Sequence, residues 1–278
     1  MKLILALSIG LFSFTSRAWA NPISDKFEVP AFENSHIQTG YTSETSLDPA
    51  NIKVLVWNIY KAGKKSFAAD FKKLASDRDV LMIQEAETNQ DMMSVLDQFS
   101  GFQFDLGVSF ITKKTGAATG TMIGSPVEKS NFAILRTKEL EPIVLTPKAV
   151  TAATFPIKGM DTELLVINIH GLNMTENTDF VKQLLSCEKL IAAHKGPVIF
   201  AGDFNTSDID KLNAMMSLSF RQGMYTVGFK NDRRRKSTFS RLLIDHTFIR
   251  GLKVLDADVP NVKGSDHKAM KMEFAVSE

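Results

Sequence analysis

The sequence predicts an α/β (α+β) fold in which two packed β-sheets are flanked by helices in a single domain. Three observations predict this fold. The composition, with 44% hydrophobic and 23% charged residues among 278, is typical of a globular protein with one large domain. From residue 53 onward, short apolar runs alternate with amphipathic stretches. The apolar runs show little polar alternation, so both faces of each strand need cover, which packed sheets with outer helices provide.

The individual elements follow from these patterns. Strands are predicted at the apolar runs 53–58, 80–84, 131–135, 149–155, 164–170, 197–201, 244–249 and 269–274. Helices are predicted where apolar residues recur at helical spacing, over 66–76, 89–99, 178–194 and 208–218. Phe102, Phe104 and Phe110 alternate as in a strand, which favours core packing over an exposed aromatic hairpin.

The first twenty residues predict a cleavable secretory signal peptide. Lys2 precedes an apolar run at 3–14, and Ala18-Trp19-Ala20 matches a small-x-small cleavage site. A membrane anchor is the alternative, but about twelve residues at about 1.5 Å each are too short to cross a hydrocarbon core about 30 Å thick. We therefore expect cleavage after Ala20, export to the periplasm or the medium, and no stable membrane insertion.

Residues 21–50 mix Pro, Ser, Thr, Asn and acidic residues without periodicity, so we expect an extended N-terminal segment before a domain at 51–278. Lys2 and Arg17 lie in the predicted signal peptide, which contains no acidic residue, and the remaining chain has equal numbers of basic and acidic residues. Net charge therefore gives no argument for a polyanionic partner.

The single cysteine, Cys187, excludes a disulfide framework and a Cys-rich metal site.

Polar residues stand at the ends of the apolar runs, where a sheet brings side chains from separate strands to one edge. These residues are Asn58, Glu85, His170, Asp203 with Asn205, Asp245, and Asp266 with His267. Taken singly, each has a simpler interpretation, as a turn cap or a hydrogen-bonded histidine. Their order along the chain, always at strand ends, favours one shared site.

The segments that carry these residues resemble the endonuclease/exonuclease/phosphatase superfamily, the deoxyribonuclease I-like metal-dependent phosphoesterases, and within it a small secreted bacterial branch. The segments are Val56-Trp-Asn-Ile, Ile83-Gln-Glu, Asn168-Ile-His-Gly, Ala201-Gly-Asp-Phe-Asn, Ile244-Asp-His-Thr-Phe-Ile and Gly264-Ser-Asp-His. The resemblance covers nearly all of residues 53–275. It implies a four-layer αββα sandwich of two packed mixed sheets, with 51–278 as the catalytic domain and the site at one edge.

The resemblance also implies a metal site. Glu85 would bind Mg²⁺ or Mn²⁺, because these hard cations favour carboxylate oxygen. Asn58 and Asp266 would complete or support that coordination shell. Any metal must sit on oxygen and imidazole, because the chain has no cysteine cluster.

Catalytic roles are implied for five further residues. Asp203 and Asn205 would hold and activate the attacking water, with Asp203 as the base. His267 would lie beside the phosphate, oriented by Asp245. His170 would bind a phosphoryl oxygen or assist the leaving group. The reaction would be in-line attack of water on a phosphoester.

Some positions depart from the family pattern. Many relatives carry a catalytic Tyr or Arg in the middle of the chain, but tyrosines occur here only at 41, 60 and 225, which leaves that role unfilled. The glycine- and threonine-rich stretch 115–124 is predicted to be a loop, either flexible or holding a phosphate through Thr119 and Gly120. His246 stands where relatives have an aromatic residue. We therefore expect its ring to stack beneath the Asp245–His267 pair, which is favoured over a position facing the site.

Basic residues cluster beside the expected site. Residues 230–241 contain six basic residues against one acidic residue, with Arg234 and Arg235 as candidate substrate-binding side chains. Lys61, Lys64 and Lys65 follow the Asn58 strand in the same way. A solvated loop is the alternative interpretation. Close to a phosphate site, these runs favour a nucleic-acid substrate.

Three functions are compatible with this reading. The favoured one is a secreted or periplasmic, Mg²⁺- or Mn²⁺-dependent phosphodiesterase, an endonuclease acting on DNA or RNA. A lipid or small-molecule phosphoesterase, of sphingomyelinase or phosphatase type, is the enzymatic alternative. A non-catalytic binding module is a third, although all the expected polar residues are present. We expect a monomer, and no protein partner is indicated.

Overall fold

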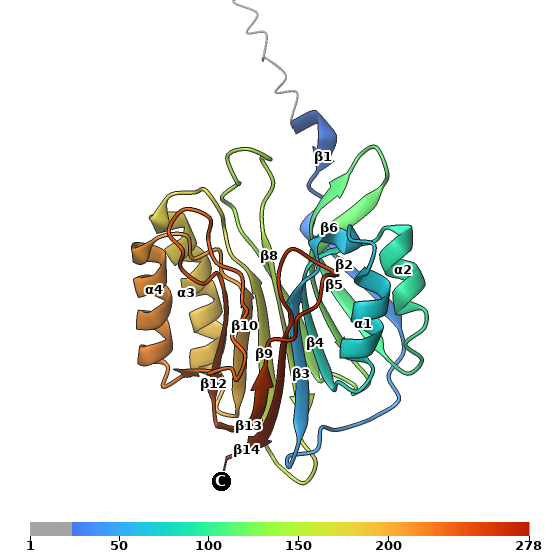
Figure 1. The fold of residues 1–278 in the computed structure, drawn as a ribbon, viewed down its shortest axis with the longest axis vertical. Coiled ribbons are helices and arrows are strands. Elements are labelled where there is room, and N and C mark those ends of the chain that lie inside the picture. Colours follow the sequence, from blue (N-terminus) through green and yellow to red (C-terminus); the bar gives the residue numbers. More distant parts are fainter. Residues whose placement is uncertain (1–23, 278) are drawn as a thin grey trace, which may run out of the picture.

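The computed structural model describes residues 24–277 and consists of two mixed β-sheets packed face to face (Figure 1). The predicted signal peptide lies outside the described residues. The first sheet has the order β1 (Phe27–Glu28), β5 (Gln103–Thr112), β6 (Ala117–Ser125), β4 (Val80–Glu87), β3 (Ile52–Asn58), β14 (Met270–Val276) and β13 (Leu252–Asp258), with β2 (His36–Gly40) also paired to β5. The second has the order β11 (Tyr225–Thr226), β12 (Asp245–Arg250), β10 (Val198–Asp203), β9 (Glu163–His170), β8 (Ala149–Pro156) and β7 (Asn131–Arg136).

Helices cover the outer faces of both sheets, which completes the predicted four-layer αββα sandwich. α1 (Phe67–Ala75) and α2 (Gln90–Leu96) lie against the first sheet, and α3 (Asn177–Ala193) and α4 (Ile209–Arg221) lie against the second (Figure 1). Three short 3-10 helices, Ser24–Lys26, Phe32–Asn34 and Tyr60–Ala62, complete the described elements. None of the helices within residues 24–277 is long and apolar enough to cross a membrane.

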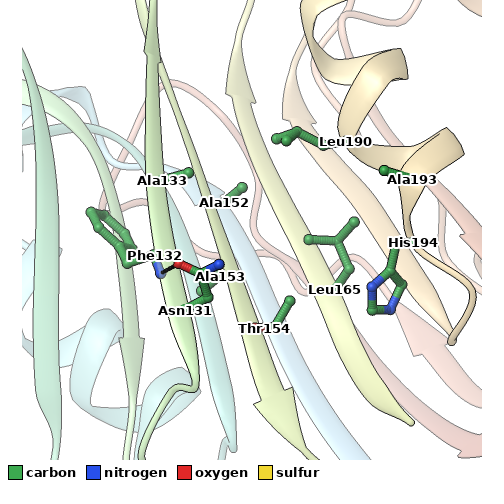
Figure 2. Close-up of a pocket in the computed structure, with 10 residues that line it drawn as sticks. All are labelled: Asn131, Phe132, Ala133, Ala152, Ala153, Thr154, Leu165, Leu190, Ala193 and His194. Atoms are coloured by element: carbon green, nitrogen blue, oxygen red, sulfur yellow. Dashed lines mark hydrogen bonds between the residues drawn. The ribbon is translucent and has the colours of Figure 1, made fainter.

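An apolar hollow of about 180 Å³ opens on the outer face of the second sheet, beside α3 (Figure 2). Small or apolar side chains from β7, β8 and β9 line most of it, together with Leu190 and Ala193 of α3. His194 also lines it, but its Nε2 lies 2.8 Å from the backbone oxygen of Glu163. The hollow therefore gathers no set of groups that could carry out catalysis.

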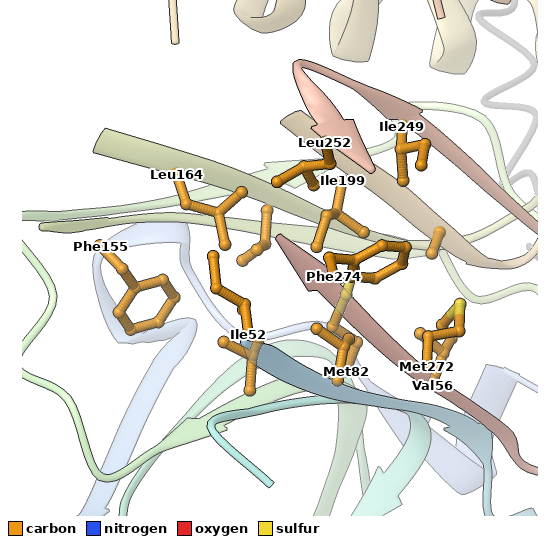
Figure 3. Close-up of a cluster of buried hydrophobic side chains, with 14 of the residues drawn as sticks. Ile52, Val56, Met82, Phe155, Leu164, Ile199, Ile249, Leu252, Met272 and Phe274 are labelled. Carbon is orange, nitrogen blue, oxygen red and sulfur yellow. The ribbon is translucent and has the colours of Figure 1, made fainter. Parts of the chain in front are cut away.

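The main core lies between the two sheets (Figure 3). Ile52, Val56 and Met82 of the first sheet meet Phe155 and Ile199 of the second, all fully buried. Because side chains alternate along a strand, the intervening residues of the same strands face the helices and form two further cores. Burial on both faces explains why these strands are nearly continuous apolar runs.

All eight predicted strands and all four predicted helices are present, with boundaries shifted by a few residues. Hydrogen-bonded caps begin two of the helices: Asn89 accepts from the Met92 N–H, and Asp208 accepts from the Lys211 N–H. Within the expected N-terminal segment 21–50, β1 and β2 pair with β5 and so extend the first sheet. The edge strand β13 was not predicted, because its charged side chains interrupt the apolar pattern.

The prediction of a loop at 115–124 was wrong for most of its length. Residues 117–125 form β6, a buried strand between β5 and β4. The glycines serve close packing, since a Cβ at Gly120 would lie 1.9 Å from the backbone oxygen of Gly107. Glycine and threonine here mark a tightly packed strand, although the same composition is typical of loops.

Candidate active site

The ends of four central strands meet at one edge of the sandwich. In the first sheet, β3 and β4 run parallel and bring Asn58 beside Gln84, next to Glu85. In the second, β9 and β10 run parallel and pair His170 with Asp203. β12 runs antiparallel to β10, so Asp245 at its start also pairs with Asp203. The predicted convergence of polar residues at one edge is therefore observed.

Hydrogen bonds from Asn58 join the two sheets at this edge. Its Nδ2 donates to Asp203 Oδ2 over 3.0 Å and to Glu85 Oε1 over 3.2 Å. Its Oδ1 accepts from the Tyr60 N–H at 3.1 Å. In this arrangement Asn58 supports the two carboxylates by donating to them, and its own oxygen is used elsewhere.

Two residues of the site adopt left-handed backbone conformations. Glu85 has φ of 51° at a β-bulge in β4, and Asn205 has φ of 49° just after β10. Such angles are uncommon for residues other than glycine and are maintained by surrounding structure. Asn205 is held by two bonds, from its N–H to Asp203 Oδ1 and from its Nδ2 to the Gly171 oxygen, both 2.9 Å. Both side chains line the same cavity.

Asp245 and His267 form a buried carboxylate–imidazole pair. His267 Nδ1 lies 2.9 and 3.0 Å from the two oxygens of Asp245, and its Nε2 lies 3.6 Å from Asp203 Oδ2. Burial alone would lower the pKa of His267, but the carboxylates of Asp245 and Asp203 outweigh it and raise this pKa to about 9. The ring is therefore a cation at neutral pH.

Asp203 lies at the centre of the site and is buried. Burial raises the pKa of its carboxyl above the usual value, and the nearby imidazole of His267 opposes this effect. Once ionised, a carboxylate with a raised pKa accepts a proton more readily than an ordinary one. Its position between two imidazoles and an amide suits a base.

His170 contacts both carboxylates and one cation. Its Nε2 lies 3.8 Å from Asp203 Oδ2, 4.0 Å from Glu85 Oε1 and 3.2 Å from Lys148 Nζ. Burial, with smaller effects from Lys148 and His267, holds the pKa of His170 well below its usual range. His170 is therefore neutral, and because an ammonium has no lone pair, its Nε2 accepts from Lys148.

Lys148 is a residue of the site that the sequence analysis missed. Its ammonium lines the cavity and lies 3.2 Å from Glu141 Oε2. It directly precedes β8, whose antiparallel pairing with β9 sets Val150 opposite Ile169. The start of β8 therefore meets the same edge as the end of β9. The sequence left unfilled a role that a Tyr or Arg in the middle of the chain has in many relatives. Lys148 provides a cation in that part of the chain.

The carboxylates of the site fit a hard divalent cation. Among residues 24–277, Asp203, Asp245 and His267 offer ligand atoms within 4.8 Å of one another, a spacing that could hold a metal ion. The cationic ring of His267 already bonds Asp245, however. Its positive charge would repel a metal ion bound between these three residues. Glu85, whose carboxylate lines the cavity and accepts from the Asn58 amide, is the better matched oxygen ligand. Asp266 lines the cavity and pairs with Arg235.

The remaining predicted substrate-binding residues divide into two groups. Arg235 lines the cavity, so its role in substrate binding stays a prediction, whereas Arg234 pairs with Asp232 and stacks on Phe229 outside the cavity. Thr119 and Gly120 were wrong as phosphate-binding candidates. Thr119 is buried in β6, where its hydroxyl donates to Glu87 Oε2 at 2.9 Å, and neither residue lines the cavity.

His246 and the lysines after β3 also lie outside the catalytic cavity. The His246 ring is buried, stacks on Phe248 and lies 2.9 Å from both Thr206 Oγ1 and the Leu243 oxygen. Burial is the main cause that lowers the pKa of His246 to about 4. Lys61 pairs with Glu87, 3.3 Å away, and Lys64 lies over the ring of Tyr60.

The site opens into a cavity of about 620 Å³, a size typical of ligand sites. Its lining combines the buried polar cluster with an outer rim. The rim includes Tyr60, Asn173, Met174, Ser207, Arg235, Lys236, Ser237, Thr238, Phe239 and Asp266. Its floor thus holds carboxylates and imidazoles, while its rim carries basic and apolar side chains together with Asp266 and several neutral polar groups.

This chain is similar in sequence or in fold to several known proteins. A "UPF0294 protein" of Vibrio campbellii (strain ATCC BAA-1116) is 29% identical over 232 residues, which are 82% of this chain and 78% of that protein. An endonuclease/exonuclease/phosphatase from Beutenbergia cavernae DSM 12333 has a similar fold, with a TM-score of 0.62 and 16% identity, covering 82% of this chain and 72% of that one. D. rerio TDP2, solved in complex with single strand DNA product, has a TM-score of 0.60 and 16% identity, covering 81% of this chain and 99% of that one.

The model of the Endonuclease/Exonuclease/phosphatase family matches residues 55–267, which include every polar residue of the cluster. Members of that family are generally phosphoesterases that depend on divalent metals. The chain belongs to the endonuclease/exonuclease/phosphatase family.

Proposed function

We propose that this protein is a Mg²⁺- or Mn²⁺-dependent phosphodiesterase that hydrolyses DNA or RNA. One observation carries the proposal: Glu85, Asn58 and Asp203, from both sheets, meet within hydrogen-bond distance beside the cationic His267. A carboxylate for a metal, a base for water and a cation for phosphate are the groups that phosphoester hydrolysis needs.

Each residue has a task in this reaction. When bound, the divalent ion would neutralise charge on the phosphate and favour ionisation of water. Asp203 accepts the proton of the attacking water, which Asn205 helps to hold. His267, kept cationic by Asp245, donates to a phosphoryl oxygen. As the new P–O bond forms, the bond to the leaving oxygen breaks on the opposite side.

Lys148 is a second cation for the phosphate. Glu141 and His170 both bond its ammonium and so hold it at the cavity. Because His170 is neutral and accepts from Lys148, it positions that cation and does not itself donate through Nε2. Fixed positive groups of this kind stabilise the charge that develops on phosphoryl oxygens.

Nucleic acid is the substrate that the rim supports best. Arg235 and Lys236 line the cavity, and basic side chains supply most of the affinity for nucleic-acid phosphates. The D. rerio TDP2 structure with single strand DNA product shares the fold at 16% identity, which makes DNA a reasonable first substrate to test. We also propose export through the N-terminal segment and a monomeric state in solution.

A substrate panel tests this proposal. The exported protein is incubated with supercoiled plasmid, RNA, sphingomyelin vesicles and a phosphomonoester, each with Mg²⁺, Mn²⁺ or EDTA. We expect metal-dependent cleavage of a nucleic acid by the wild type and its loss in Asp203→Asn. Choline release from sphingomyelin without nucleic-acid cleavage would instead identify a lipid phosphoesterase. A lack of activity on all substrates would support a binding module.

A further inference from the structure

Three exposed apolar side chains stand on the rim of the catalytic cavity. Phe239 is 95% exposed, Met174 is 63% exposed and Tyr60 is 46% exposed, and all three line the cavity. They come from three separate segments, after β3, after β9 and before β12. The proposed hydrolysis uses the polar groups on the cavity floor and gives these three side chains no role.

Phe239 is carried by an ordered hairpin, residues 235–244. Lys236 and Leu243 form an isolated β-bridge, and the Ile244 N–H donates to the Arg235 oxygen at 3.2 Å. Nearer the tip, the Ser237 N–H donates to the Leu242 oxygen at 2.8 Å. Phe239 lies in the turn that these bonds close. The ring is therefore presented to solvent by a supported structure.

Tyr60 is also held in place. Its backbone is left-handed, with φ of 50°, and its N–H donates to the side chain of Asn58. The ammonium of Lys64 lies 5.1 Å from the centre of its ring. The backbone of Tyr60 is thus tied directly to a residue of the catalytic cluster, and its ring carries the ammonium of Lys64 on one face.

The hairpin also borders two cavities, and its basic side chains contribute to the lining of both. Lys236 lines both the catalytic cavity and a neighbouring one of about 480 Å³. Arg241 lines the second cavity, and Arg235 lines the first. Asp266 pairs with Arg235, and Asp232 also lines the second cavity. Lys236 is therefore the basic side chain that a phosphate chain would meet on leaving the catalytic cavity, with Arg241 beyond it.

We propose that this hairpin is a stacking platform for unpaired bases, so that the preferred substrate is single-stranded nucleic acid. The inference rests on the proposed nuclease function and adds the substrate class. A base beside the scissile phosphate stacks on Phe239, with Tyr60 as a second aromatic surface, while Lys236 contacts a phosphate. In a duplex, neighbouring bases cover these faces, so only an unpaired strand gains the stacking.

The hairpin tip favours bases over a lipid surface. Phe239 is flanked by Thr238 and Ser240, with Arg241 next, so the tip carries one apolar side chain in a polar setting. An anchor in a membrane needs a larger continuous apolar surface. Aromatic rings beside basic residues are instead the arrangement of proteins that bind single strands.

The test compares oligonucleotides that differ only in their bases. The wild type and Phe239→Ala are assayed on a single strand, on the same sequence as a duplex, and on a single strand whose nucleotides lack bases around the cleavage site. Phe239→Trp restores an aromatic ring. Phe220→Ala is the matched control, because Phe220 is 85% exposed on α4 and does not line the cavity.

We expect the wild type to favour the base-bearing single strand over both other substrates. Phe239→Ala should lower kcat/KM on that strand at least fivefold, which corresponds to the loss of one stacked base, and should remove the preference over the abasic strand. Phe239→Trp should restore both, and Phe220→Ala should match the wild type.

Two results would overturn the stacking proposal and leave the nuclease function intact. One is that Phe239→Ala cleaves the base-bearing strand as fast as Phe220→Ala does. The other is that Phe239→Ala loses binding to sphingomyelin vesicles while its cleavage of oligonucleotides is unaffected, which would assign the hairpin to a lipid surface. A wild type that cleaves none of the oligonucleotides overturns the nuclease function as well.

Discussion

Asn58 Nδ2 lies 3.0 Å from Asp203 Oδ2, and this hydrogen bond connects the end of β3 in one sheet to the end of β10 in the other. The same nitrogen also donates to Glu85. One amide thus sets the distance between two carboxylates that belong to different strands. The site depends on the packing of the two sheets as much as on its own side chains.

Asn58→Ala tests the importance of this connection. The change removes both hydrogen bonds, so Asp203 and Glu85 lose their common donor. We expect activity on nucleic acid to fall about 10- to 100-fold, as for other residues that orient metal ligands. Steady-state kinetics at saturating Mn²⁺ measure this. Activity within twofold of the wild type would show that the amide does not position the carboxylates.

Lys148→Met tests the unexpected cation. The substitution keeps a long side chain but removes the charge beside His170. We expect kcat to fall about 10²- to 10³-fold, similar to the loss of one donor to a developing oxyanion. Lys113→Met is the control, because Lys113 is exposed in the turn between β5 and β6. Equal effects of the two substitutions would contradict a catalytic role for Lys148.

Gly120→Ala tests the placement of residues 117–125 in a buried strand. The new Cβ would overlap the backbone oxygen of Gly107, so we expect the free energy of unfolding to fall by about 1–3 kcal/mol. Gly228→Ala is the control, because a Cβ there meets no atom within 4 Å. Urea denaturation measures both. A neutral Gly120→Ala would favour the loop that the sequence suggested.

Much of the fold could be predicted from the sequence, for a physical reason. Strands such as 53–58 and 164–170 are buried on both faces, so their apolar runs are unbroken and their ends are sharp. Polar residues at the ends of the apolar runs, such as Glu85 in β4 and His170 at the end of β9, had to reach one edge once the strands paired. The same reasoning failed for β6, where glycines fit the tight approach of neighbouring strands.

Other parts of the site depend on pairing that the sequence does not reveal. Lys148 precedes a strand, and it reaches the site only because β8 runs antiparallel to β9. Arg234 and Arg235 are adjacent in a basic run, yet only Arg235 faces the cavity. Arg234 is held away from the cavity by its bonds to Asp232 and to the Asp245 oxygen, which are contacts that a sequence does not reveal.

The buried His246 predicts a pH dependence of stability. Its pKa is about 4 in the folded protein and about 6.5 when exposed, so between these values the unfolded state binds more protons. The neutral ring costs nothing above pH 6.5, and stability falls as the pH drops below it. We expect a loss of about 2.5 kcal/mol at pH 4.5 relative to pH 7 from this residue.

Urea denaturation of the wild type and His246→Phe at pH 7 and 4.5 isolates this contribution. Phenylalanine keeps the stacking on Phe248 but does not titrate. The wild type should lose about 2.5 kcal/mol more than the variant over this range. An equal loss in both proteins would show that His246 is protonated in the folded state at the same pH as when unfolded.

The rate of oligonucleotide hydrolysis as a function of Mn²⁺ concentration tests the central claim most directly. Metal-free wild type should be inactive, and activity should rise and saturate with Mn²⁺. Glu85→Gln should need at least about tenfold more Mn²⁺ for half-maximal activity, whereas Glu128→Gln, an exposed control, should match the wild type. Full activity in EDTA, or the same Mn²⁺ dependence in Glu85→Gln and the wild type, would contradict a metal-dependent site built on Glu85.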